Sequence, residues 1–182
     1  QGVADPDGEE DTGQRSVFMD VYAALAKFHM KSFGTTQAQL AAVAAKNHAH
    51  SAHNPLSQYR EAMTVDEVMA ARKVSWPLTL PMCSPISDGA AAAILCREEE
   101  LDRFDRSRAV KIHATALRTG SDRDPQEFDR HITHLAARDA YARAGLGPED
   151  MHVAEVHDAT AFAEIQQVEN LGFCDFGEGG AL

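Results

Sequence analysis

The sequence predicts an α/β fold in which helices cover a parallel sheet. Three observations in the second half of the chain lead to this prediction. Residues 109–117 alternate between apolar and polar side chains, as the residues of a strand do. Residues 128–144, and the residues from Thr160 onward, repeat apolar side chains at helical spacing, and a short apolar run at residues 151–156 separates them. The order strand, helix, strand, helix implies a right-handed parallel crossover.

The first 75 residues are predicted to form helices and loops without a sheet. Residues 1–15 are rich in Gly, Asp and Glu and are expected to be a loop. A helix with one apolar stripe is expected from Ser16 to Gly34, because glycine is the residue that most often ends a helix. Capping boxes that begin at Thr36 and Thr64 are expected to open two further helices.

The middle of the chain changes character at Trp76. Residues 78–89 form an apolar stretch interrupted by Pro and Ser, which is typical of a loop. Residues 90–95 are rich in Ala, and helix propensity favours a helix there. Residues 97–104 are charged and are expected to be an exposed helix or turn, and residues 173–182 end the chain as a Gly-rich segment.

Composition and charge limit the classes of function. With 44% hydrophobic and 25% charged residues, the chain can bury a normal core. The net charge of −11 argues against sequence-independent nucleic-acid binding, which requires Lys and Arg at phosphates. We expect no membrane span and no secretory leader, because no apolar run is long enough and no basic leader precedes one. Cys83, Cys96 and Cys174 are widely spaced and odd in number, which favours a reducing compartment, and hence a cytoplasmic location, over a disulfide framework.

Three histidines, His48, His50 and His53, lie close together in the sequence. Imidazole is the commonest transition-metal ligand, so a metal site is one interpretation. A metal site also needs a shared face and usually a carboxylate or thiolate, and neither residue type is adjacent. A polar helix end that leads into a loop is the favoured interpretation, and no metal site is predicted.

The residues His157 and Asp158 stand between the predicted strand at 151–156 and the helix after it. Ligands of open α/β sheets bind at the carboxyl ends of strands, so an imidazole and a carboxylate at this junction are candidate site residues. The alternative is that Asp158 caps the helix and His157 hydrogen-bonds nearby backbone. The spacing of the residues leaves both interpretations open.

Four stretches, in order along the chain, resemble the thiolase superfamily, and in particular its sterol-carrier-protein X type (lipid-transfer-protein-like) members. Residues 46–59, with Lys46-Asn47-His48, resemble the family's loop domain, and residues 84–92 resemble the end of its N-terminal half. The run His157-Asp158-Ala159 resembles the His-Asp-Cys form of its C-terminal catalytic loop. The last stretch, residues 169–180, resembles the segment that the family carries after that loop.

This resemblance implies a partial thiolase-like fold with αβαβα layers, which is an α/β class. It divides the chain into a helical loop-domain region at residues 1–75, the end of the N-terminal half at 76–105 and the start of the C-terminal half at 106–182. It also implies that residues 90–95 form a buried strand despite their helix propensity, since tertiary context overrides propensity in a parallel sheet.

The resemblance implies a chemistry as well: making or breaking a carbon–carbon bond next to a coenzyme A thioester through an oxyanion-stabilised enolate. His157 matches the position that holds the thioester oxygen, and Asp158 is expected to fix its tautomer or orient the loop. Ser84 matches a serine beside the pantetheine arm of coenzyme A. Thr160 replaces an aromatic that lines the pantetheine tunnel. The coenzyme A thioester is the substrate, and no further cofactor is expected.

The family's nucleophilic cysteine, its Gly-His-Pro histidine and its Cys-x-Gly-Gly-Gly cysteine have no counterpart in these 182 residues. They are expected upstream of Gln1 and downstream of Leu182, so the chain is interpreted as a central fragment that is inactive alone. Cys83 and Cys174 are expected to be small buried hydrophobes.

Two alternative functions remain, and the resemblance also implies binding partners. One is a retro-aldolase subunit for a β-hydroxyacyl-CoA, of the steroid side-chain type, that works with a zinc-ribbon/OB-fold partner. The other is a thiolase-like subunit that binds acyl-CoA without catalysis. The full-length protein is expected to be a homodimer or tetramer.

Overall fold

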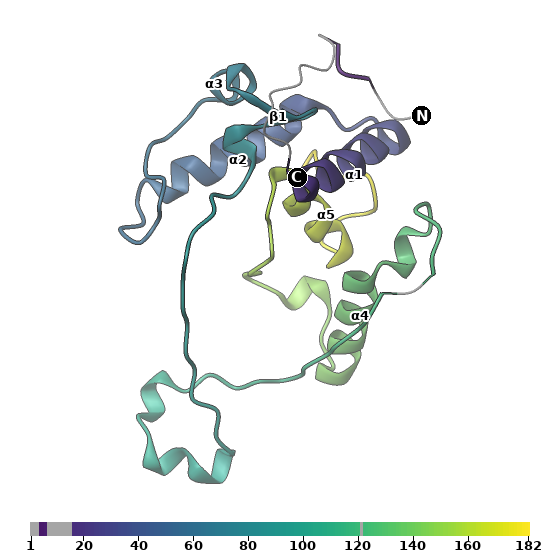
Figure 1. Cartoon of the computed structure of the whole chain (residues 1–182). Helices are drawn as coiled ribbons and strands as arrows, with labels where there is room; N and C mark the ends of the chain where they lie inside the picture. The colour runs from purple at the N-terminus through teal and green to yellow at the C-terminus, as the bar shows by residue number, and fades with distance from the viewer. Residues whose placement is uncertain (1–3, 7–15, 121) are drawn as a thin grey trace.

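A computed structural model describes residues 4–6, 16–120 and 122–182. Most of the loop predicted at residues 1–15 lies outside these residues. Helices α1, α2, α3 and α5 gather in one part of the molecule, and α4 lies beside them (Figure 1). Residues 98–108, which we name the 3-10 lobe, sit far from this group at the end of two long extended segments.

The predicted N-terminal helices are confirmed. Helix α1 (Val17–Phe33) ends at Gly34, whose φ of 80° is left-handed and whose N–H donates to the Met30 carbonyl at 2.9 Å. Helices α2 (Gln37–Ser51) and α3 (Val65–Ala70) both open with capping boxes, in which side chain and backbone satisfy each other's hydrogen bonds. The periodicity and the cap residues together located these three elements.

The only sheet among the described residues is a small antiparallel hairpin. Strand β1 (Lys73–Ser75) pairs with β2 (Leu78–Thr79) across the cis Trp76–Pro77 bond. The 3-10 turn η1 (Leu80–Met82) comes directly after it. β2 is fully buried, so the hairpin fastens the next loop to the core.

The three longer strands predicted from the sequence are absent from the described residues, and these predictions are wrong. Residues 90–95 form neither helix nor buried strand and are exposed, and residues 109–117 and 151–156 have no regular structure. In residues 109–117 the expected inward face is open, with Val110 88% exposed. A strand needs a neighbour for its backbone groups, and no backbone hydrogen bonds join these segments to another described strand.

The charged segment at 97–104 forms the 3-10 helix η2 (Glu98–Arg103), and η3 (Arg106–Arg108) completes the lobe, both exposed as expected. The single helix predicted over residues 128–144 is instead two elements, η4 (Phe128–Arg130) and α4 (Ile132–Ala144).

The break in this predicted helix falls at His131, which is extended and caps α4 by accepting a hydrogen bond from the Thr133 N–H at 3.2 Å. Local side-chain capping therefore wins over the helical pattern. Phe128 packs between the rings of Phe33 and Phe176, with centroids at 4.9 and 5.8 Å, and joins this region to α1. No residue of α4 is fully buried.

Helix α5 (Ala161–Asn170) completes the core, and Gly172 lies just past its end with a φ of 79°. The 3-10 turn η5 (Pro148–Asp150) precedes it in the chain. The core lies where α1, α2, α3, α5 and the hairpin meet. Its largest fully buried side chains include Phe162, Leu40, Leu78, Met82, Ile165 and Val68.

A buried polar network joins α1 to α5 and to the C-terminal segment. The carboxylate of Glu169 contacts His29 Nε2 at 2.9 Å and accepts the Gly179 N–H at 3.0 Å. His29 Nδ1 lies 2.8 Å from the hydroxyl of Thr35. Because a carboxylate only accepts, Nε2 of His29 carries a proton. Every buried polar group of the network is therefore satisfied.

Candidate functional site

A groove of about 240 Å³ lies between α2, the turn after it, the segment after η1 and the start of α5. The segment after η1 carries Ser84, and Asp158 lies just before the start of α5. The lining residues are Ala44, Asn47, His48, Ser51, Ser57, Gln58, Tyr59, Pro81, Met82, Cys83, Ser84, Pro85, Asp158 and Ala161. Three parts of the chain that are far apart in sequence therefore line the same groove.

Backbone pairing brings Ser84 to the His157–Asp158 junction. The Ser84 N–H and the Ser84 hydroxyl both donate to the Ala159 carbonyl, at 3.1 and 3.2 Å. The preceding residue, Cys83, forms an isolated antiparallel bridge with Thr160. Because the Ser84 hydroxyl proton is engaged, its oxygen can act toward a ligand only as an acceptor, and Ser84 lines the groove.

The two candidate catalytic residues lie at different places relative to this groove. Asp158 lines it, whereas the neighbouring His157 is exposed, is not among the lining residues and makes no hydrogen bond to another described residue. Burial raises the pKa of the Asp158 carboxyl, and the negative charge of Glu164 adds to that effect against the opposing charges of His157 and Lys46. The interpretation of Asp158 as a helix cap is wrong, because Thr160 caps α5.

Thr160, predicted to contact the substrate, is 1% exposed. Its hydroxyl accepts the Ala163 N–H at 3.3 Å, which is the hydrogen bond of a helix N-cap. Thr160 is not among the described residues that line the groove. Its hydrogen bond instead holds the start of α5 in place. Its role toward a substrate remains a prediction.

The α2 wall of the groove contains residues to which the sequence assigned no chemical role. The Asn47 side-chain amide donates to Glu164 on α5 at 2.7 Å, and Lys46 forms an ion pair with the same carboxylate. His48 stacks on Tyr59 with ring centroids 6.2 Å apart and an interplanar angle of 22°. The only sequence signal for these four residues was that they fall in the stretch 46–59, which resembles a loop domain.

The two half-buried cysteines are poor nucleophiles. Burial raises the pKa of the Cys83 thiol to about 11. Burial, together with the negative charges of Glu169, Glu178 and Asp175, raises the pKa of Cys174 to about 11 as well. Since the thiolate is the reactive form, neither is prepared to attack an acyl group at neutral pH.

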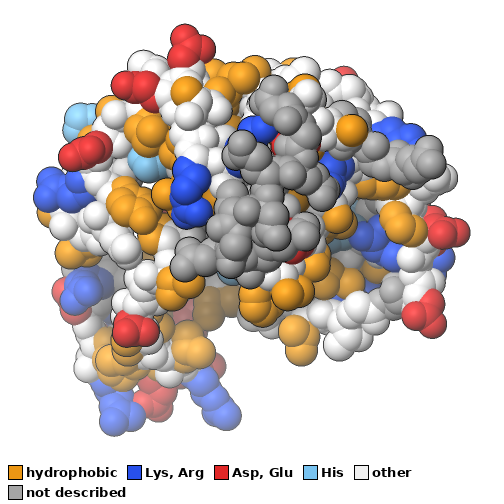
Figure 2. Space-filling view, turned by 45° about the horizontal axis from the view of Figure 1, so that its top comes forward, with side chains coloured by type: hydrophobic (Ala, Val, Ile, Leu, Met, Phe, Trp, Pro, Cys, Tyr) orange, Lys and Arg blue, Asp and Glu red, His pale blue; other side chains and the backbone are white. Residues whose placement is uncertain are grey.

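Three further observations concern metals, charged surfaces and membranes. Among the described residues, no three His, Cys, Asp or Glu side chains are grouped closely enough to hold a metal ion, so the three histidines of residues 48–53 do not converge. On the face drawn in Figure 2, acidic and basic side chains are interspersed and do not form one basic patch. No helix within the described ranges is long and apolar enough to cross a bilayer.

Residues 114–182 match the family described as thiolase C-terminal domain-like. The acetyl-CoA acetyltransferase of Methanothermobacter thermautotrophicus is 42% identical over 176 residues, which cover 96% of this chain and 46% of that protein. Sterol carrier protein 2 of Rattus norvegicus is 38% identical over 172 residues, covering 89% of this chain and 31% of that protein. The benzoylsuccinyl-CoA thiolase subunit BbsB of Thauera aromatica is 33% identical, covering 93% and 44%.

Among solved structures, a chain of the Ltp2-ChsH2(DUF35) aldolase superposes with a TM-score of 0.72 at 23% identity, covering 99% of this chain and 50% of that one. This likeness confirms the predicted thiolase-like fold, although the segments expected as strands are unpaired here. The chain spans between about a third and a half of the length of these three relatives. Its sequence matches and its fold agree, and the chain is similar to thiolases along nearly its whole length.

Proposed function

We propose that this chain is a section of an enzyme that makes or breaks a carbon–carbon bond next to a coenzyme A thioester. The observation that carries the proposal is the pairing of Ser84 with Ala159, which brings Ser84 and Asp158 to one groove and joins two stretches expected to act together. The similarity to an acetyl-CoA acetyltransferase and to a thiolase subunit supports the same class of substrate.

In this proposal the imidazole of His157 donates a hydrogen bond to the thioester oxygen as negative charge develops on it. His157 is exposed and makes no hydrogen bond to another described residue, so both ring nitrogens are open to a substrate. Asp158, one residue on, lines the groove itself. Ser84 presents an acceptor to the pantetheine arm farther along the same groove.

A second candidate function is retro-aldol cleavage of a β-hydroxyacyl-CoA with a partner subunit. It is favoured by one observation: a solved structure that shares the fold is that of an aldolase. In that reaction the leaving enolate needs the same oxyanion donor, so His157 keeps its role. A binding subunit without catalysis is the third candidate, and a homodimer or tetramer remains the expected assembly.

The proposal is tested by His157→Ala in the full-length protein. We expect turnover of an acyl-CoA substrate to fall more than about tenfold, because removal of one oxyanion donor has at least that effect. His152→Ala is the matched control, since His152 is also an exposed histidine and lies five positions earlier in the chain. Unchanged kinetics in His157→Ala, with an intact fold, would remove this residue from the active site.

Binding of coenzyme A to the 182-residue chain alone is expected to be weak. Its groove of about 240 Å³ is smaller than the usual ligand pocket of roughly 300–1,000 Å³. Calorimetry with coenzyme A measures this affinity directly. Submicromolar binding would contradict the view that further walls are needed.

A further inference from the structure

We propose that Glu164 is a positioning residue that orients the Asn47 side chain so that its carbonyl oxygen accepts a hydrogen bond from an amide N–H of the ligand. This inference rests on the proposed function, since it assumes that the pantetheine arm of a coenzyme A thioester occupies the groove. It assigns to the α2 wall a role in selecting the ligand.

The geometry at Glu164 links two helices that are far apart in sequence. Its side chain is 16% exposed, and its two carboxylate oxygens have separate partners on α2. Oε1 forms the ion pair with the ammonium group of Lys46, and Oε2 accepts a hydrogen bond from Asn47 Nδ2 at 2.7 Å. The ion pair fixes the position of the carboxylate, and the carboxylate fixes the amide.

The orientation of the Asn47 amide is set by the chemistry of its partner. A carboxylate has no proton to donate, so the asparagine must present its NH₂ group to Glu164 and cannot present its oxygen. This removes the usual ambiguity between the nitrogen and oxygen of an amide. Asn47 Oδ1 has no hydrogen-bond partner in the described part of the chain, and Asn47 lines the groove.

The groove wall therefore presents acceptors from three elements. Asn47 offers its amide oxygen, Ser84 offers a hydroxyl oxygen whose proton is bound to the Ala159 carbonyl, and Asp158 offers a carboxylate. Such a wall favours ligand groups that donate hydrogen bonds. The two amide N–H groups of pantetheine are donors of this kind, and an ester at the same position is not.

The experiment compares coenzyme A thioesters with analogues in which one pantetheine amide is replaced by an ester, at each of the two amides in turn. Competitive inhibition constants are measured on the full-length protein. We expect the natural protein to prefer the amide over the ester by about tenfold at one of the two positions, as one hydrogen bond implies. Asn47→Ala is expected to lose that preference.

The Glu164 variants separate positioning from a general structural effect. Glu164→Ala is expected to lose the preference as Asn47→Ala does, and the double variant to lose no more than either alone. Glu164→Gln keeps the size of the side chain, but a glutamine can donate as well as accept and makes no ion pair with Lys46, so it no longer sets the orientation of the Asn47 amide and is expected to weaken the preference.

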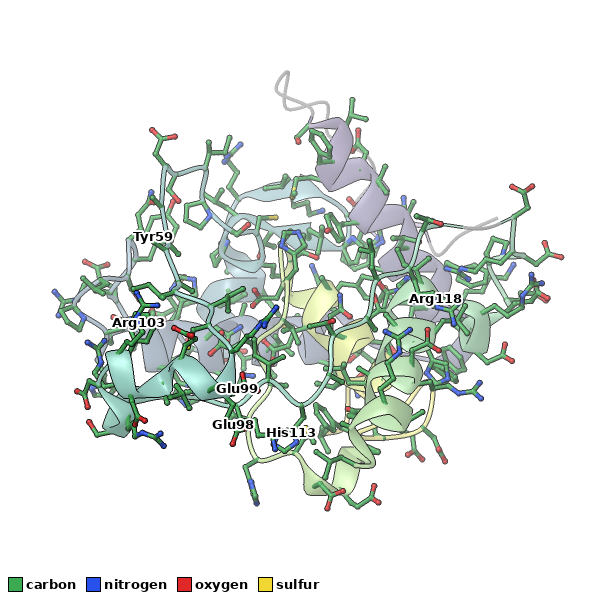
Figure 3. All side chains as sticks on the ribbon, turned by 90° about the horizontal axis from the view of Figure 1, so that it is seen from below. Tyr59, Glu98, Glu99, Arg103, His113 and Arg118 are labelled. Carbon is green, nitrogen blue, oxygen red and sulfur yellow. The ribbon has the colours of Figure 1, made fainter. Side chains whose placement is uncertain are left out.

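Glu99→Ala is the control for loss of a carboxylate, since Glu99 lies on the 3-10 lobe (Figure 3), far from α2 and α5. Full preference for the amide in Asn47→Ala, or no preference in the natural protein, overturns the inference while leaving the proposed function standing. Failure of the natural protein to bind any coenzyme A thioester overturns the proposed function itself.

Discussion

Removal of the Glu169 side chain is the perturbation whose effect on stability can be worked out most directly from the structure. In Glu169→Ala, the His29 Nε2–H and the Gly179 N–H both lose their acceptor inside the core, where His29 is 2% exposed. An unpaired buried donor costs about 1–3 kcal/mol, so the two together imply a loss of about 2–6 kcal/mol. That loss is a large fraction of the stability of a typical domain.

Glu169→Gln is the informative comparison, because it keeps the shape and changes only the hydrogen-bonding groups. The glutamine oxygen can accept from Gly179, and its NH₂ can donate to His29 Nε2 if the imidazole moves its proton to Nδ1 and donates to Thr35. The network then stays satisfied, and we expect a loss of no more than about 1 kcal/mol.

Urea unfolding of the 182-residue chain, followed by circular dichroism, gives these free energies if the slopes of the variants agree. Glu178→Ala is the control, since this carboxylate is exposed and is expected to change the free energy of unfolding by less than about 0.5 kcal/mol. A Glu169→Ala variant as stable as Glu178→Ala would refute the view that the network carries stability.

Three further predictions concern titration. The thiols of Cys83 and Cys174 have pKa values near 11, against an ordinary 9.0, and this two-unit difference makes their thiolates about 100-fold scarcer. Alkylation at pH 7.5, followed by peptide mass spectrometry, should therefore be slower at both than at the exposed Cys96. Burial lowers the pKa of His131 below its ordinary 6.5, so the unfolded chain binds more protons at this residue than the folded chain does. The free energy of unfolding should therefore fall as the pH drops through 6.5. His131→Asn keeps a side chain that can cap α4 and should flatten this part of the pH profile of urea unfolding. The pKa of Asp158 is raised, so its charge opposes folding above its ordinary 3.8; Asp158→Asn should raise the urea midpoint at pH 7, with the gain vanishing below pH 3.8.

The elements predicted correctly from the sequence are those whose signals are local. Thr36 and Thr64 start helices because each caps with the residue three positions on, and Gly34 ends one because it adopts a positive φ. The strand patterns failed for a physical reason. Alternation at residues 109–117 marks a face suited to burial, whereas a strand also needs neighbours, and no local signal supplies them.

The candidate site was predictable in part. The resemblance picked out Ser84, and the strand-to-helix junction picked out Asp158; the structure brings these two to one groove. Thr160 has the contacts of a cap, which its position before an apolar helical repeat was enough to suggest. Asn47 and Glu164 are hydrogen-bonded although they lie 117 positions apart in the sequence, and the spacing of apolar residues cannot predict such a distant pair.

The link from Ser84 to Ala159 is a contact between residues far apart in the sequence. It joins residues 75 apart, and closing a flexible loop of that length costs about 4 kcal/mol of chain entropy before any contact of α5 repays it. Helix α5 inserts between α1 and α2 only once that loop is closed, so the core is expected to assemble late and slowly. Lengthening or shortening the loop, by contrast, changes this entropy only logarithmically, and the segment that carries the 3-10 lobe is therefore where the fold tolerates insertions and deletions best.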